Sequence, residues 1–190
     1  MKNFEYDLGY IQACLEEMES YLLSDEVFWP ISATPPQGAP DFPRLTLGSL
    51  LIAETRLKAY PQAQAQSALV ERVLADIEHI RSKWRVMWEK KAGRSYSVRL
   101  RMWSEFLDEY RSSPQDNGDR YAYEVRLRVM LELLKMEGGG QPQAEVEMLG
   151  GLDRYLKSVL KTGGFIWEAE VQSGFSKGIY WCLYGELPLH

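Results

Sequence analysis

The chain has 190 residues, of which 45% are hydrophobic and 26% are charged, and its net charge is −5. These values predict a single domain over residues 1–190 with a sizeable core, which the apolar periodicity described below makes helical, and they argue against general affinity for nucleic acid or anionic membranes. The two cysteines, Cys14 and Cys182, exclude a disulfide framework, and no apolar run is long enough to span a membrane, so we expect a cytoplasmic protein.

The first predicted element is an amphipathic helix at residues 4–23. Its apolar residues, from Phe4 to Leu22, follow one another at alternating spacings of four and three, which is the stripe of a helix packed on a core. Asn3 stands where an N-cap is expected.

The segment 25–43 interrupts the helical pattern. Five of the nine prolines of the chain lie in it, and proline restricts the backbone and removes a hydrogen-bond donor. The segment also contains Phe28, Trp29 and Phe42, which need a surface against which to be buried. We therefore expect a Pro-rich loop that wraps around the helices, not a solvated linker.

Three helices are predicted next, at residues 47–60, 63–92 and 95–112. The second of them is expected to end at Gly93, because glycine favours the left-handed C-cap conformation. Trp84 and Trp103 fall in the apolar stripes of their helices and are predicted to be buried. Trp88 is one position off its stripe and is predicted to lie at the edge of the core.

The last part of the chain is predicted to hold two helices, at 119–137 and 142–161, and then an antiparallel β-hairpin at 165–184. In the hairpin the apolar period changes to two on both sides of a turn at 172–177. The predicted fold is thus mainly α, a six-helix bundle with a short C-terminal antiparallel β-hairpin and a Pro-rich wrapping loop. Because a lone hairpin is marginally stable in water, we expect it to pack on the helices or on another chain.

Charge is concentrated in one stretch, residues 81–101, which carries +7 against −12 for the rest of the chain. Such cations could follow a phosphate backbone or bind an acidic partner. The alternative, which we favour, is ion pairing with acidic faces of neighbouring helices. The eight cations of this basic stretch are Arg81, Lys83, Arg85, Lys90, Lys91, Arg94, Arg99 and Arg101.

A second candidate surface combines the Pro-rich loop with the predicted hairpin. Trp and Tyr are frequent in ligand clefts and in protein interfaces, so an aromatic cleft between these two segments could bind a small molecule or a partner. The alternative is a loop that only covers the core. The residues concerned are Phe28, Trp29, Phe42, Trp167, Tyr180, Trp181 and Tyr184.

The usual catalytic and metal-binding patterns are missing from the sequence. Of the two histidines, His79 lies beside the apolar stripe of its helix, which favours a surface position over metal ligation. The glycines 138–140 follow a helix and lack the lysine and hydroxyl residue of a phosphate-binding loop. The sequence therefore favours a non-catalytic protein without metal or cofactor, although carboxylates that meet only in space would escape this reasoning.

Three functions remain open at this stage. The first is a non-catalytic helical-bundle protein that acts through protein–protein contact, with self-association to a homo-oligomer. The second is a nucleic-acid-associated protein that uses the basic stretch. The third is a small-molecule binder or enzyme at the aromatic cleft. No membrane partner is expected.

Overall fold

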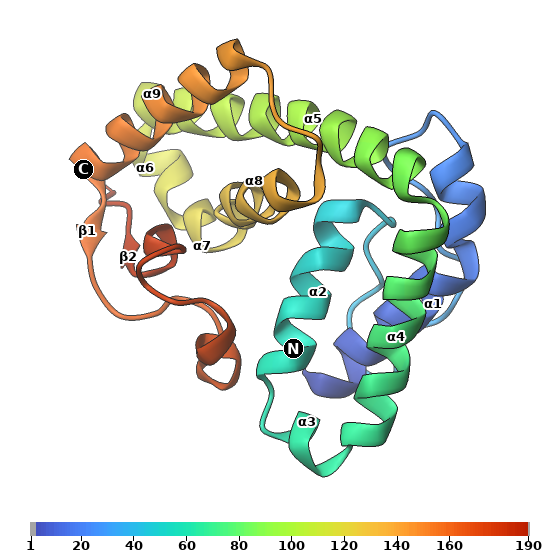
Figure 1. The fold of residues 1–190 in the computed structure, drawn as a ribbon. Helices are drawn as coiled ribbons and strands as arrows, with labels where there is room; N and C mark the ends of the chain where they lie inside the picture. Colours follow the sequence, from blue (N-terminus) through green and yellow to red (C-terminus); the bar gives the residue numbers. More distant parts are fainter. Residues whose placement is uncertain (1–2, 190) are drawn as a thin grey trace.

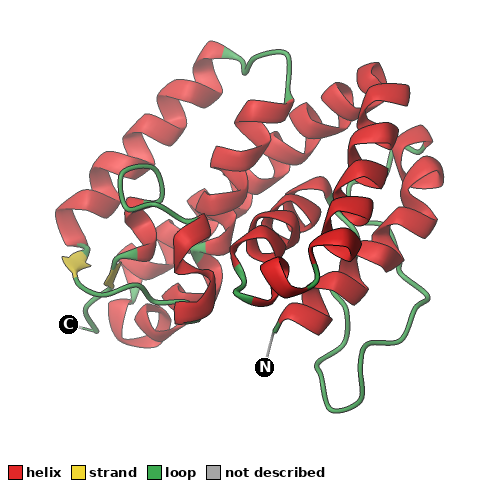
Figure 2. Ribbon diagram, turned by 60° about the horizontal axis from the view of Figure 1, so that its bottom comes forward, coloured by secondary structure: helices red, strands yellow, loops and turns green. Residues whose placement is uncertain are grey.

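The computed structural model describes residues 3–189, and most of them are helical (Figure 1, Figure 2). The helices are α1 (Phe4–Leu23), α2 (Leu47–Ala59), α3 (Gln62–Ala65), α4 (Ser67–Lys83), α5 (Arg85–Ser112), α6 (Pro114–Asn117), α7 (Tyr121–Glu124), α8 (Arg126–Glu137) and α9 (Gln143–Val159). Strands β1 (Lys161–Thr162) and β2 (Gly185–Glu186) form a small antiparallel sheet. A mainly α protein with a short antiparallel strand pair near its end is thus confirmed, whereas the predicted division into six helices is not.

The first two long helices begin where the sequence predicts, at polar caps. The Asn3 side chain accepts a hydrogen bond from the backbone N–H of Tyr6 at 2.9 Å, and Thr46 accepts one from Ser49 at 3.1 Å. Each cap satisfies a backbone donor that has no partner inside its helix and contributes about 1 kcal/mol. α2 ends at Ala59, with Tyr60 as its C-cap and Pro61 next in the chain, so this helix also ends close to where the sequence predicts.

The Pro-rich loop, residues 25–43, folds back on α1 and has almost no regular structure. Trp29 and Leu45 form an isolated antiparallel bridge that closes the loop at its base. The Phe42 ring packs against the rings of Tyr6 and Tyr10, with centroids 5.2 and 5.7 Å away. The loop is therefore held by its aromatic residues, as expected for a segment that is not a solvated linker.

The prediction of helices at 63–92 and 95–112, separated by a capped turn at Gly93, is wrong. The chain bends earlier, at Trp84 (φ −112°, ψ 30°), and α5 continues through Gly93 to Ser112. A glycine inside a helix costs only about 1 kcal/mol, and the packing of α5 along α8 outweighs this cost. The predicted helix start at 63 is also interrupted, because α3 ends before α4 begins at Ser67.

The bend at Trp84 changes which tryptophan reaches the core. Trp88, predicted at the edge, is 2% exposed, whereas Trp84, predicted to be buried, is only half-buried. Trp103 is completely buried as predicted, and its ring stacks on Phe106. The stripe that assigns Trp84 to the core assumes one straight helix, so the assignment fails at the point where the helix bends.

The later helices follow the prediction more closely. The region 119–137 is divided into a 3₁₀ turn (Gly118–Arg120), α7 and α8, although the backbone of Val125 between the two α-helices stays helical. The helix predicted at 142–161 is α9, which passes through Gly150 and Gly151 without interruption.

The β-hairpin predicted at 165–184 is not formed. This segment contains two 3₁₀ helices, Ala169–Gly174 and Trp181–Leu183, and the paired strands β1 and β2 lie just outside it. The reason is Phe175, which falls in the predicted turn but is completely buried. Trp167 and Tyr180 both pack edge-on against it at 5.2 Å, so the flanking segments surround Phe175. Ile166 donates a backbone hydrogen bond to the Leu183 carbonyl at 3.0 Å, but this contact does not extend into paired strands.

The core lies where α2, α5 and α8 meet. α8 packs along α5, α2 packs between α1 and α8, and α9 lies along the outer part of α5 (Figure 1). The C-terminal segment returns to α2, where Gly174 approaches so closely that a Cβ atom would lie 3.1 Å from the Thr55 carbonyl oxygen. Among the described helices none combines the length and apolar character needed to cross a bilayer.

Candidate functional site

The basic stretch begins with Arg81, at the end of α4, which joins three helices. Its guanidinium forms ion pairs of 2.7–3.4 Å with carboxylates from α2, α4 and α8, those of Glu54, Glu78 and Glu137. The same group lies over the ring of Trp88, 4.9 Å from its centroid. Arg81 is therefore engaged within the chain.

Lys91 is a cation of the basic stretch that is buried. Its side chain donates hydrogen bonds of 2.8 and 2.7 Å to the carbonyl oxygens of Ser24 and Glu26, and it lies over the Tyr21 ring. Ser24 caps the C-terminus of α1, where a positive charge is favourable. Burial, followed by repulsion from Arg94, lowers the pKa of Lys91 to about 8.

Arg99 is the second buried cation, with 4% of its surface exposed. It donates to the Thr46 hydroxyl at 3.0 Å and lies over the Phe28 ring, but within residues 3–189 it forms no ion pair. Burial and, to a smaller extent, the neighbouring charge of Arg126 lower the pKa of Arg99 to about 10.

The remaining cations of the basic stretch lie at the surface. Three of them are paired: Lys83 with Glu19, Arg85 with Glu89 and Arg94 with Asp25. In the described part of the chain Lys90 and Arg101 make no hydrogen bond or ion pair, and both are exposed. Six of the eight cations thus have internal partners. The use of this stretch for nucleic acid stays a prediction, which a gel-shift series at low salt would check.

The seven aromatic residues predicted to line a cleft do not converge. Trp167 lines a cavity, and Phe42 lies behind two tyrosines that line the same cavity. The others have separate environments: Phe28 under Arg99, Trp29 bonded to Glu17, Tyr180 and Tyr184 around Phe175, and Trp181 under Lys157.

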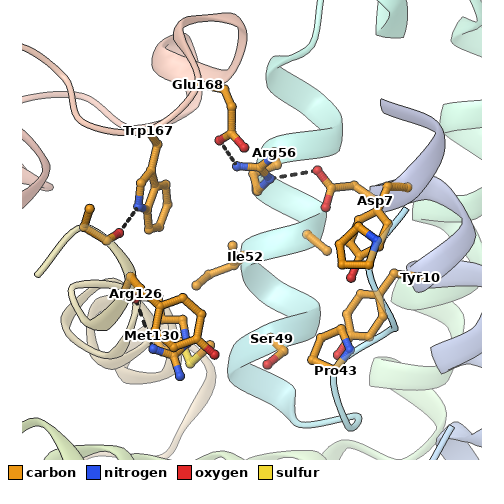
Figure 3. A pocket seen from close by; sticks show the side chains of 15 residues that line it. Asp7, Tyr10, Pro43, Ser49, Ile52, Arg56, Arg126, Met130, Trp167 and Glu168 are labelled. Carbon is orange, nitrogen blue, oxygen red and sulfur yellow. Dashed lines mark hydrogen bonds and ion pairs between the residues drawn. The ribbon is translucent and has the colours of Figure 1, made fainter. Parts of the chain in front are cut away.

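The cavity itself lies between the Pro-rich loop and the C-terminal segment, where a cleft was expected. It has a volume of about 360 Å³ and is bounded by α1, α2, α7 and α8 (Figure 3). Pockets for small molecules occupy roughly 300–1,000 Å³ and are mostly apolar, with a few polar groups. The lining fits this description, with apolar and aromatic groups that include Tyr10, Pro43, Ile52, Tyr123, Met130 and Trp167.

One face of α2 forms the floor of the cavity. Ser49, Ile52 and Arg56 are spaced by three and four residues, so they lie along one side of the helix and point the same way. Seven residues of helix span about 10 Å. Ser49 and Arg56 therefore mark opposite ends of the cavity, with Ile52 between them (Figure 3).

The Arg56 end of the cavity is a buried ionic network. Arg56 donates to the carboxylates of Asp7 at 2.7 Å and Glu168 at 2.8 Å, and to the Tyr60 hydroxyl at 2.7 Å. Tyr60 in turn donates to Asp7 at 2.8 Å. The network joins α1, α2 and the C-terminal segment, and it keeps the pKa of Arg56 above its usual value despite burial.

Burial changes the ionisation of Tyr60, which belongs to this network, and of the two cysteines of the chain. Burial and the Asp7 charge raise the pKa of Tyr60, so its phenol stays protonated at neutral pH. Burial also raises the pKa of the Cys14 and Cys182 thiols to about 12, which makes both unreactive. No cluster of His, Cys, Asp and Glu in residues 3–189 could hold a metal ion.

Sequence reasoning placed a cleft in this region but missed most of its polar residues. Asp7, Arg56 and Arg126 lie on helices far apart in the sequence, and each looks like an ordinary charge on an amphipathic helix. One signal was available: Arg56 is spaced to share a face with Ser49 and Ile52, a mixed polar and apolar face on a helix that also packs in the core.

Comparison with known proteins adds no assignment to this geometry. No protein-family model, no curated protein and no solved structure matches the chain.

Proposed function

We propose that the protein binds a small organic molecule with a flat, apolar body in the cavity between the Pro-rich loop and the C-terminal segment. The observation that carries the proposal is the cavity, about 360 Å³ with walls of aromatic, proline and aliphatic side chains. Flat rings pack well against such walls because aromatic groups favour stacked and edge-to-face contacts.

The walls are held in place before any ligand arrives. Trp167 donates from its indole nitrogen to the Ala122 carbonyl at 3.1 Å and packs edge-on against Phe175. On the opposite side, Tyr10 donates to the Arg44 carbonyl at 3.3 Å and contacts Phe42. A preorganised site favours binding because little conformational entropy is lost when the ligand enters.

The proposal is tested with the neutral fluorescent probe phenylnaphthylamine, a flat apolar molecule of suitable size. The variant Ile52→Trp fills the cavity from its floor and should abolish probe binding. The matched control is Leu74→Trp, because Leu74 is also a half-buried aliphatic residue but lies on α4, which contributes no residue to the cavity. Thermal unfolding verifies that both variants are folded.

The proposal fails if phenylnaphthylamine does not bind the wild-type protein, or if it binds the folded Ile52→Trp variant as tightly as the control. A thermal-shift screen of metabolites with flat rings then identifies the class of natural ligand. Self-association, the first hypothesis from the sequence, stays a separate prediction, and light scattering at high protein concentration checks it.

A further inference from the structure

Arg126 lines the cavity and, within residues 3–189, leaves one edge of its guanidinium without a partner. Its Nη1 atom donates to the Tyr123 carbonyl at 3.0 Å and to the Glu124 carboxylate at 2.9 Å. Nε and Nη2 donate to no atom of the described residues. These two atoms form the side of the guanidinium that can bind two oxygens of a carboxylate, phosphate or sulfonate at once.

The orientation of Arg126 is restricted, so this edge is preorganised. The guanidinium lies over the Tyr123 ring, 3.5 Å from its centroid, while the Glu124 contact holds Nη1. Arginine is well suited to such a position because a stacked guanidinium keeps its in-plane donors available. Arg126 lies near the Ser49 end of the cavity, away from Arg56 (Figure 3).

Arg99 adds a second positive charge near the Ser49 end of the cavity, although it does not line the cavity itself. It donates to Thr46, whose hydroxyl is 3.0 Å from the hydroxyl of the cavity-lining Ser49. Arg99 is buried and forms no ion pair within residues 3–189, and its Nε atom has no acceptor there. A buried charge without a counterion is costly, so a negative group nearby would stabilise this end of the protein.

The N-terminus of α2 adds partial positive charge to the same end of the cavity. Thr46 caps this helix of 13 residues, and Ser49 is in its first turn. The first turn of a helix carries partial positive charge, which favours an anion. By contrast, the carboxylates of Asp7 and Glu168 lie at the Arg56 end, so the acidic side chains among the described lining residues are at the end away from Arg126.

From these observations we infer that the ligand is an organic anion, which places an acidic group against the Nε–Nη2 edge of Arg126 and its flat apolar body between Trp167, Ile52 and Tyr10. The inference rests on the proposed function, since it assigns the chemical class of the molecule bound in the same cavity. The acidic group is a carboxylate, phosphate or sulfonate, because each presents at least two oxygens to the guanidinium edge.

Two fluorescent probes with the same ring system test the inference. Anilinonaphthalene sulfonate carries an acidic group, and phenylnaphthylamine is the same molecule without it. We expect the wild-type protein to bind the sulfonate at least roughly tenfold more tightly. Arg126→Gln should remove this preference and leave the affinity for phenylnaphthylamine within about twofold, because a charge-assisted hydrogen-bonding pair is lost while the apolar walls remain.

The matched control is Arg120→Gln. Arg120 also pairs with Glu124, at 3.4 Å, but it does not line the cavity, so its loss should leave both affinities unchanged. Arg126→Lys, which keeps the charge and loses the two-donor edge, should retain only part of the preference.

The outcomes separate the two proposals. Equal binding of the two probes by the wild-type protein, or an unchanged preference in folded Arg126→Gln, overturns the inference but leaves the proposed function intact. Failure of the wild-type protein to bind phenylnaphthylamine overturns the proposed function itself. Benzoate and inorganic phosphate serve as competitors of anilinonaphthalene sulfonate. If phosphate displaced this probe and benzoate did not, the result would contradict the assignment to an organic anion.

Discussion

The basic stretch at 81–101 and the cavity differ in how their charged residues are distributed along the sequence: they are clustered in the first and widely separated in the second. The basic stretch is conspicuous because eight cations lie within 21 consecutive residues, yet six of them have partners inside the chain. The charged residues of the cavity do not form a local cluster in the sequence, because they are separated by up to 161 positions, from Asp7 to Glu168. Local charge density reports the composition of a helix surface, whereas a binding site requires charges to converge from several elements.

One of the two largest effects should come from Arg56, which connects the two carboxylates at one end of the cavity. Arg56→Met is expected to lower the free energy of unfolding by about 3–5 kcal/mol, because Asp7, with 4% of its side chain exposed, loses the guanidinium that compensates its charge. Denaturant unfolding measures this change.

A matched arginine from the basic stretch supplies the control. Arg85 pairs with Glu89 at the surface, where water and salt screen the interaction, so Arg85→Met should leave the free energy of unfolding unchanged within experimental error. Equal losses in Arg56→Met and Arg85→Met would contradict the contrast between the two regions.

The next effect distinguishes two tryptophans of the basic stretch. Trp88→Ala should cost about 3–5 kcal/mol, because a buried ring is removed and Glu137 loses the hydrogen bond donated by the indole at 2.8 Å. Trp84→Ala should cost roughly 1–2 kcal/mol, because this ring is only half-buried. Chemical unfolding measures both losses. A larger loss in Trp84→Ala than in Trp88→Ala would contradict the bend at Trp84 and support the single straight helix that the apolar stripe predicts.

The smallest effect is a pH dependence that originates at Lys91. Its pKa in the folded protein is about 8, below the ordinary value of 10.5, so between these pH values the unfolded chain binds more protons. Stability contributed by this group therefore rises as the pH increases from about 8 toward 10.5. Lys91→Met removes the titration, so wild type should gain stability relative to this variant over that range.

Lys90→Met is the control for the pH series, because Lys90 is the exposed neighbour of Lys91. Its stability relative to wild type should change only slightly with pH over the same interval, because the charge of Lys90 contributes much less than burial to the lowered pKa of Lys91. Unfolding curves at several pH values measure both differences. A constant difference between wild type and Lys91→Met would contradict the assignment of the lowered pKa to Lys91.

Much of the secondary structure could be predicted from the sequence because it depends on local chemistry. Asn3 and Thr46 cap α1 and α2 with their own side chains, and the alternating spacing from Phe4 to Leu22 identifies the buried face of α1. The prolines at 25–43 exclude a helix there because each proline restricts its own backbone and lacks the N–H that a helix needs.

Tertiary structure alone decided the features that depend on a distant partner. Gly93 stays helical because α8 packs along α5, and the predicted hairpin is absent because the core takes up Phe175. In the same way, Arg81 and Arg126 are both arginines on amphipathic helices. The first pairs with three carboxylates, whereas the second lines a cavity and keeps one edge of its guanidinium free of the other described residues. Capping and periodicity act over a few residues, whereas burial and charge pairing depend on which segments the fold brings together.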